Sequence, residues 1–362
     1  MKLFVPVRTV AAWGGLHEWV LTAVGDLLSA GHEVTVAGSV GRFKDEVIAS
    51  GASFIDVNWN TWKESVAGCV AAGPYDRVFG HGPLARNLGL RVSEATMAPF
   101  YHMLHGAYLD YIDAWSPLAE RILTASPSIQ DLAVRVGKVE PWKVQVIPNG
   151  APEWVFDLPL IPEAEKLSKG TAVIATAARL APDKIRQIEP TIELTRHLAA
   201  LKPDIGFTLS IMGDGPSRDL FERRLSAGLG DVKNVEIEFL GWVPHEEVPR
   251  ILNSAYAACA AGMGATRALA AGCLTVAAGA QGNVGVQVGR NLTAGLWSNF
   301  GDHGCPRFTP TPLEADLSRL TTPGAYDEIV LRAREACHFQ RNDRHVRAAL
   351  LDSLDLHMEY KK

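Results

Sequence analysis

Short apolar runs alternate with amphipathic stretches through the first half of the chain. The first run, residues 2–7, is followed by a glycine pair and by an amphipathic stretch at residues 16–30 that ends at Gly31. Short apolar runs predict strands, and a helical period that stops at a glycine predicts a helix with its C-cap. The series continues at residues 34–37, 53–57, 77–79, 100–104, 121–124 and 144–147. Such alternation predicts βαβ units and a parallel sheet.

The alternation restarts after a polar, proline-rich stretch at residues 151–170, which we interpret as an interdomain linker. The second set of candidate strands is residues 171–176, 207–212, 235–240, 256–258 and 274–277. The predicted fold class is therefore α/β, with two Rossmann-like doubly wound domains facing a central cleft. The expected domains are residues 1–165 and 166–340. A C-terminal helix, expected over about 338–360 and counted as residues 341–362, crosses back to the first domain.

Length, charge and cysteine content limit the number of domains, the kinds of partner and the cellular compartment that we expect. At 362 residues the chain exceeds the usual size of one domain, and 47% hydrophobic residues can fill two cores. The net charge of -5 gives no reason to expect nucleic acid or an anionic membrane as a partner. Five widely spaced cysteines suit neither a disulfide framework nor a metal site, which favours a reducing cytoplasm. The most membrane-like window, residues 255–280, carries Arg267, so we expect a soluble protein without stable membrane insertion.

Two loops have residues suited to bind an anion. Gly14 and Gly15 lie between a strand and a helix, where free backbone N–H groups suit a phosphate or a sugar hydroxyl. A tight turn without a ligand fits this pair equally well. Arg179 and Lys184 are five positions apart just after a strand and could reach one anion from the same loop. An exposed basic loop is the alternative there.

Two glycine-containing segments follow. Residues 213–216 (Gly-Asp-Gly-Pro) are read as a turn and a helix N-cap, a structural role. Gly262 and Gly264 form a glycine loop before an alanine-rich helix, and such a loop suits a diphosphate. Arg267 inside that helix either has a partner or lies at the surface, because an unpaired buried charge is costly.

In their order, these motifs resemble those of the retaining GT-B glycosyltransferases of the GT4-like family, over about residues 1–300. The likeness is carried by Gly14-Gly15 with residues 31–34, His105-Gly106, residues 146–150 (Val-Ile-Pro-Asn-Gly), Arg179 with Lys184, residues 211–216, and residues 239–243 (Phe-Leu-Gly-Trp-Val). The resemblance implies an enzyme that moves a sugar from a nucleotide-sugar donor, a UDP- or GDP-sugar, to a small-molecule acceptor. It also implies that the anomeric configuration is retained.

The resemblance implies site residues as well. Arg179 and Lys184 would neutralise the donor diphosphate, and His105 would donate a hydrogen bond to the donor sugar or serve only as a structural histidine at a strand end. The expected donor-binding residues are Gly14, Gly15, Asn149, Gly213, Trp242, Val243, Gly262, Gly264 and Arg267. The expected acceptor-binding residues, on loops of the first domain, are Trp13, His17, His81 and Tyr101.

The chain departs from the family at one motif. The family has two glutamates eight positions apart before its alanine-rich helix, and those positions are read here as Cys259 and Arg267. Without an acceptor for the ribose hydroxyls, the free energy of donor binding should be less favourable by about 1 to 3 kcal/mol per missing hydrogen bond. An arginine at this position favours contact with a phosphate instead. An unusual donor or donor pose is therefore expected. A degenerate GT-B protein that activates another transferase is the alternative, and a sugar-nucleotide epimerase is a third.

The sequence also bears on metal and acceptor. It holds no Asp-x-Asp motif, so we expect metal-independent transfer without a cofactor, in which Arg179, Lys184 and helix N-termini stabilise the leaving group. Aromatic and polar residues on the acceptor side suit a small polar molecule better than a lipid. The alanine-, glycine- and arginine-rich composition suggests a GC-rich bacterial genome, where natural-product biosynthesis is a reasonable setting.

Overall fold

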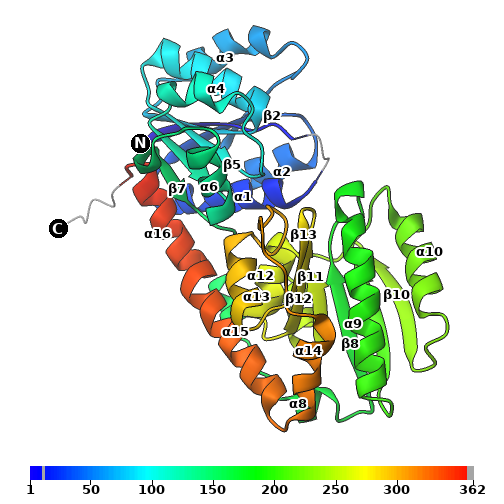
Figure 1. Ribbon diagram of the computed structural model, residues 1–362. Helices are drawn as coiled ribbons and strands as arrows, with labels where there is room; N and C mark the ends of the chain where they lie inside the picture. Colours follow the sequence, from blue (N-terminus) through cyan, green and yellow to red (C-terminus); the bar gives the residue numbers. More distant parts are fainter. Residues whose placement is uncertain (10–12, 357–362) are drawn as a thin grey trace. The chain divides into compact units, whose positions relative to one another are not determined.

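The chain folds into two α/β units, shown in Figure 1 as a computed structural model that describes residues 1–9 and 13–356. Unit 1 comprises Met1–Pro148 and Val346–Lys362, and unit 2 comprises Asn149–His345. Unit 1 is therefore built from two separate stretches of sequence. Its second stretch follows the whole of unit 2 along the chain.

In the described residues, unit 1 holds a seven-stranded sheet with the order β3-β2-β1-β4-β5-β6-β7. The strands are β1 (Lys2–Pro6), β2 (Glu33–Gly38), β3 (Ser53–Asp56), β4 (Arg77–His81), β5 (Phe100–Leu104), β6 (Arg121–Thr124) and β7 (Val144–Val146). All neighbouring pairs are parallel, as predicted. The helices between them are α1 (Gly15–Ser29), α2 (Arg42–Ala49), α3 (Val66–Ala71), α4 (Pro83–Thr96), α5 (Ile112–Trp115) and α6 (Pro127–Arg135). A parallel sheet is covered by helices on both faces, which explains why nearly all residues of the central strands β1, β4 and β5 are buried.

Unit 2 repeats this plan, with the described strand order β10-β9-β8-β11-β12-β13. The strands are β8 (Thr171–Ala177), β9 (Gly206–Met212), β10 (Val235–Gly241), β11 (Ala257–Ala260), β12 (Leu274–Gly279) and β13 (Gly282–Val286). The helices are α7 (Glu153–Phe156), α8 (Glu163–Lys166), α9 (Ile188–Leu201), α10 (Arg218–Leu229), α11 (Val248–Ser254), α12 (Gly262–Ala270), α13 (Gly289–Trp297), α14 (Leu313–Leu317) and α15 (Ala325–Arg341). The sequence did not predict β13, which pairs antiparallel with β12. Its two glycines in five residues make a weak strand pattern.

The segment that we predicted to be a linker, residues 151–170, packs within unit 2. Ala151 and Val155 are fully buried there. The Lys166 ammonium is also buried and donates hydrogen bonds to Ala255 O at 2.6 Å and Gly272 O at 3.1 Å. Prolines and charged residues are frequent in this stretch, but apolar residues between them attach it to the core.

The predicted C-terminal helix is divided in two. Asn342 is extended between α15 and α16 (Asp343–Ser353), and it forms a parallel bridge with Ala151. Ala151 N donates to Arg341 O at 2.7 Å and Asp343 N donates to Ala151 O at 3.0 Å, so the pairing replaces helical hydrogen bonds at the break. The predicted return to the first domain is confirmed, because the chain joins unit 1 again at Val346. The end of the predicted helix, from residue 357, lies outside the described residues.

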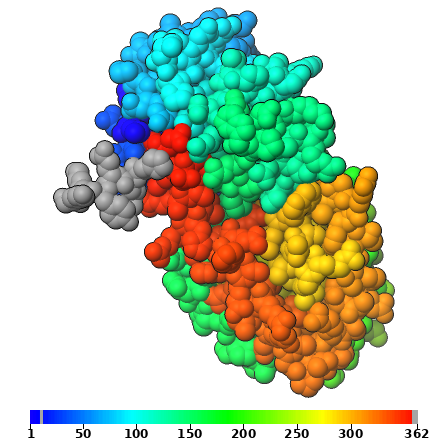
Figure 2. Space-filling model, turned by 60° about the vertical axis from the view of Figure 1, so that its left-hand side comes forward, coloured from blue at the N-terminus to red at the C-terminus, as the bar shows by residue number. Residues whose placement is uncertain are grey.

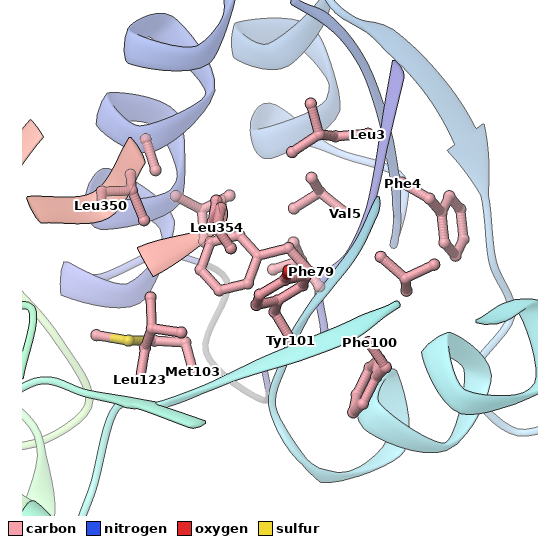
Figure 3. Packing of buried hydrophobic residues seen from close by; sticks show 14 of the residues in the cluster. Leu3, Phe4, Val5, Phe79, Phe100, Tyr101, Met103, Leu123, Leu350 and Leu354 are labelled. Atoms are coloured by element: carbon pink, nitrogen blue, oxygen red, sulfur yellow. The ribbon is translucent and has the colours of Figure 1, made fainter. Parts of the chain in front are cut away.

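The returning segment completes the core of unit 1. Leu350, Leu351, Leu354 and Leu356 are buried in the same apolar cluster as the central strands. Figure 3 shows Leu354 beside Phe79 and Tyr101. The Tyr101 hydroxyl donates to Asp355 Oδ2 at 2.7 Å, and the Arg121 guanidinium pairs with Asp355 Oδ1 at 3.1 Å. In Figure 2 this segment, coloured red, lies directly against the rest of unit 1.

Candidate functional site

The order of the parallel strands reverses once in each sheet. In unit 2 the reversal falls between β8 and β11, and in unit 1 between β1 and β4. Open parallel sheets bind ligands at such a switch point, just beyond the carboxyl ends of the strands. The loops after β8 and β11 are therefore the candidate site of unit 2, and those after β1 and β4 the candidate site of unit 1.

The predicted basic pair lies at the switch point of unit 2. Arg179 follows β8 in the loop, and Lys184 lies in the short 3₁₀ helix that comes next (Pro182–Gln187). Arg179 Nη2 is 3.1 Å from Asp183 Oδ1, and Lys184 Nζ is 2.6 Å from Asp302 Oδ1. The Arg179 side chain is 38% exposed but that of Lys184 only 16%. Each cation thus forms an ion pair with a carboxylate, and the Lys184 side chain is the less exposed to solvent.

The Gly-Asp-Gly-Pro turn supports the loop that carries Arg179. Leu180 N donates to Asp214 O at 3.0 Å. A Cβ at Gly213 would lie 1.9 Å from Ala178 O, and one at Gly215 would lie 2.4 Å from Leu180 O. Gly213 and Gly215 also have φ values of +142° and +153°, which favour glycine. The two glycines therefore serve close packing between two loops, a role beyond the turn and cap that we predicted.

The glycine loop that we predicted at Gly262 and Gly264 is wrong. Only Ala261 separates β11 from α12, and both glycines lie in the first turn of that helix. A Cβ at Gly264 would lie 2.7 Å from Ala177 O, so the glycine lets α12 approach the end of β8. Gly262 N donates to Asn299 O at 3.2 Å. The first turn of α12 is thus packed against the end of β8 and against residues 298–304, which we call the 298–304 segment.

The two positions read as lost glutamates differ in the structure. Cys259 lies inside β11, fully buried, and burial raises the pKa of its thiol to about 12. It is a core residue and does not belong to a loop, which corrects our interpretation of that position. Arg267 lies in the second turn of α12 and is partly buried. Its contact with a donor stays a prediction.

Sequence reasoning missed the 298–304 segment. Asp302 Oδ1 accepts from Lys184 Nζ and also from Ala280 N at 3.1 Å, directly after β12. Asn299 and Phe300 have positive φ values of 51° and 58°, which are uncommon for residues with side chains. Such a backbone conformation leaves no pattern of apolar and polar positions. The only signal in the sequence is the glycine on either side of Asp302 and His303.

Asn149, predicted to bind the donor, contacts the same segment. Its Nδ2 donates to Asn299 Oδ1 at 3.2 Å, while its carbonyl oxygen accepts from the buried Arg341 at 3.4 Å. At the next residue, Gly150, a Cβ would lie 1.8 Å from Asp343 Oδ1, so the Asp343 side chain would have to move to admit one. The motif that resembles the end of the family's first domain thus has a structural use here.

Trp242 and Val243 follow the end of β10. Trp242 is 47% exposed, whereas Val243 is partly buried against the apolar cluster that includes Met212. Gly213 N donates to Gly241 O at 2.7 Å, which links the ends of β9 and β10. A large aromatic face is therefore accessible two strands away from Arg179 and Lys184.

In unit 1, histidines gather at the ends of β4 and β5. His81 Nδ1 lies 2.9 Å from His105 Nε2, and the Trp19 ring packs on both at 5.6 and 5.1 Å. His81 is fully buried, and its pKa lies well below 6.5 because of desolvation first and the nearby His105 and His102 second. The pair is therefore joined by one hydrogen bond at neutral pH, with His81 uncharged. His105 stays a candidate for sugar contact.

Three of the four expected acceptor residues are corrected by their burial. His81 and His17 are buried at 0% and 4% exposure, so neither side chain can reach a molecule in solution in this structure. Tyr101 is in the core and bonds to Asp355. Trp13 is partly exposed, but His17 stacks on its ring at 5.4 Å and the Arg42 guanidinium lies 3.9 Å from its ring centroid. Side chains at the ends of strands face either the core or the neighbouring loops. The sequence alone did not show which of these residues face the core.

No protein-family model matches the sequence, and no curated protein matches it. Solved structures do match in fold. A glycosyltransferase from Rickettsia africae is 15% identical with a TM-score of 0.72, over 100% of this chain and 99% of that one. HepE from Anabaena, in complex with UDP and glucose, is 17% identical with a TM-score of 0.70, over 98% and 99%. The UDP-GlcNAc 2-epimerase from Neisseria meningitidis, bound to UDP-GlcNAc, is 12% identical with a TM-score of 0.54, over 99% and 100%.

These likenesses show a GT-B-like fold of two Rossmann-like domains, which transferases and an epimerase share. Within residues 1–9 and 13–356, no cluster of three or more His, Cys, Asp or Glu side chains could hold a metal ion. The same described residues contain no helix that is long and apolar enough to span a membrane.

Proposed function

We propose that the protein is a glycosyltransferase that moves a sugar from a nucleoside-diphosphate donor to a small polar acceptor. The observation that carries the proposal is the position of Arg179 and Lys184, on one segment at the switch point of unit 2 beside the first turn of α12. A diphosphate leaving group requires positive groups at that place. The fold that the chain shares with solved glycosyltransferases supports the same reading.

In this proposal the bond between the anomeric carbon and the diphosphate oxygen breaks while an oxygen of an acceptor hydroxyl bonds to the same carbon. Negative charge develops on the leaving diphosphate, which takes up the hydroxyl proton. Lys184 has three N–H donors and donates one to Asp302, which leaves two that can donate to phosphate oxygens. Arg179 offers a planar fork for a second contact. Trp242 and Val243 border the nucleobase, and His105, joined to His81, donates to the sugar. We expect retention of anomeric configuration from the family resemblance and assign no nucleophile.

Nucleotide release tests the proposal. The purified protein is incubated with UDP- and GDP-sugars, with and without a panel of small polar acceptors, and free nucleoside diphosphate is measured. A transferase releases it in an acceptor-dependent way, whereas an epimerase changes the sugar nucleotide without needing an acceptor. A protein that serves only as an activator releases none by itself, and that outcome would contradict the proposal.

Arg267 is the residue where the chain differs most from the family. We predict that it touches a phosphate or the ribose of the donor, because a guanidinium only donates hydrogen bonds and a phosphate oxygen is its stronger partner. Arg267→Ala should then mainly raise the donor KM, and Arg267→Glu should abolish donor binding or alter the nucleotide preference. Steady-state kinetics with varied donor measures this. Unchanged donor kinetics in Arg267→Ala would refute the contact.

Activity should not depend on a divalent ion. The proposal places the positive field on Arg179, Lys184 and the N-terminus of α12, and the sequence holds no Asp-x-Asp motif. We therefore expect the same turnover before and after treatment with EDTA. Turnover that disappears with EDTA and returns with magnesium or manganese would show that this electrostatic assignment is wrong.

A further inference from the structure

Asp302 places a carboxylate inside the site proposed for an anion. Its Oδ1 accepts from Lys184 Nζ at 2.6 Å and from Ala280 N at 3.1 Å. Its Oδ2 lies beside Gly262, where a Cβ would come within 2.6 Å of it. These neighbours follow β8, β12 and β11 respectively. The carboxylate therefore lies beyond the carboxyl ends of β11 and β12, where Lys184 reaches it, with its side chain only 18% exposed.

A carboxylate at this place would repel a diphosphate unless another group were bound between them. Its favourable partners are cations and neutral hydrogen-bond donors, because an ionised carboxylate only accepts. Among the described residues, Oδ2 has no hydrogen-bond donor, whereas Oδ1 has two. A nucleotide sugar offers such donors in its hydroxyl groups, on the transferred sugar and on the ribose. Asp302 could therefore accept hydrogen bonds either from the transferred sugar or from the ribose.

The order of the strands decides between them. Trp242, proposed to border the nucleobase, follows β10, two strands from β8 on one side. Ala280 and Asp302 lie at the end of β12, two strands from β8 on the other side. With strands about 4.8 Å apart, each step of two strands spans roughly 10 Å. A donor with its base at β10 and its diphosphate at β8 therefore has its sugar, and not its ribose, at β12.

We propose that Asp302 accepts hydrogen bonds from hydroxyl groups of the transferred sugar while it holds Lys184 at the diphosphate. This assignment rests on the proposed function. It supplies, from the 298–304 segment, a carboxylate that the chain lacks at residues 259 and 267. Asp302 forms no covalent bond in this role and accepts no proton.

Calorimetric titration of the full-length protein tests the assignment, with UDP against UDP-glucose and GDP against GDP-mannose as probes. We expect Asp302→Asn to weaken binding of the sugar nucleotide by about tenfold or more, because a hydrogen bond to a neutral amide replaces a stronger one to a carboxylate. The matching nucleoside diphosphate, which has the ribose but no sugar, should bind equally well or more tightly because a negative charge is gone. A merely structural role would not separate the two ligands.

Glu163→Gln is the matched control. Glu163 pairs with Lys202 at 2.8 Å and is 17% exposed, but it precedes β8 and lies at the amino ends of the strands, away from the proposed site. This variant should bind both probes as the wild type does. Equal weakening of both probes in Asp302→Asn, or no weakening of either, would overturn the role of Asp302 alone. A wild-type protein that binds none of the four probes would instead overturn the proposed function, and this assignment with it.

Discussion

Lys184→Ala should lower turnover by about a hundredfold or more, which corresponds to about 3 kcal/mol of lost charge stabilisation. The change removes one of the two cations proposed to face the leaving group and also leaves the Asp302 carboxylate without its cationic partner. The site therefore becomes more negative at the moment when charge develops on the diphosphate. Arg179→Ala should act in the same direction with a loss of similar size. Single-turnover measurements at saturating donor would separate this loss from weaker binding.

Lys202→Ala provides the control for this prediction. Lys202 also forms an ion pair at 2.8 Å with a poorly exposed carboxylate, that of Glu163, and it also belongs to unit 2. It lies before β9, at the amino ends of the strands. Its loss should leave turnover near that of the wild type. Near-wild-type turnover in a folded Lys184→Ala protein would remove this lysine from the mechanism.

Gly213→Ala should destabilise unit 2 by about 2 to 5 kcal/mol and also reduce activity in the folded fraction. The new Cβ would lie 1.9 Å from Ala178 O, and φ at this position is +142°. Relief requires the loop that begins at Ala178 to move, and Arg179 moves with it. The melting temperature should fall by roughly 5 to 15 °C. Thermal unfolding and turnover measured on the same preparation would show both effects.

Gly282→Ala is the comparable change without a clash. Gly282 is also in unit 2, at the start of β13, and a Cβ there would meet no atom within 4 Å. We expect its stability to stay within about 0.5 kcal/mol of the wild type. If Gly213→Ala also melts within a few degrees of the wild type, the two loops do not depend on the glycine as we argue.

The apolar pattern was sufficient for the fold because buried parallel strands leave a strong signal. Twelve expected strands, from residues 2–7 to residues 274–277, correspond to β1 through β12. The pattern failed where apolar and polar signals were weak or mixed. The glycine-rich β13 was missed, and the segment at residues 151–170 was read as a linker although Val155 and Lys166 are buried.

The site could be predicted only in part, for a different reason. Arg179 and Lys184 are close in sequence, so their spacing shows that they share a loop. The carboxylate that holds Lys184 lies 118 positions away at Asp302, and no local pattern relates the two. Burial was the other difficulty. His81 and Tyr101 belong to strands whose side chains alternate between two covered faces, and an aromatic or polar residue there looks the same in sequence whether it reaches a ligand or the core.

The discontinuity of unit 1 affects how the protein is made. Its central sheet is complete at Val146, but the leucines that cover part of it emerge from the ribosome only after the whole of unit 2. At ordinary rates of translation this delay is on the order of 10 to 40 s. During that interval the nascent unit exposes the apolar surface around Phe79 and Tyr101 that Leu354 later covers. An isolated fragment ending at Pro148 would keep that surface exposed permanently, so expressing unit 1 by itself requires residues 346–356 to be joined to it.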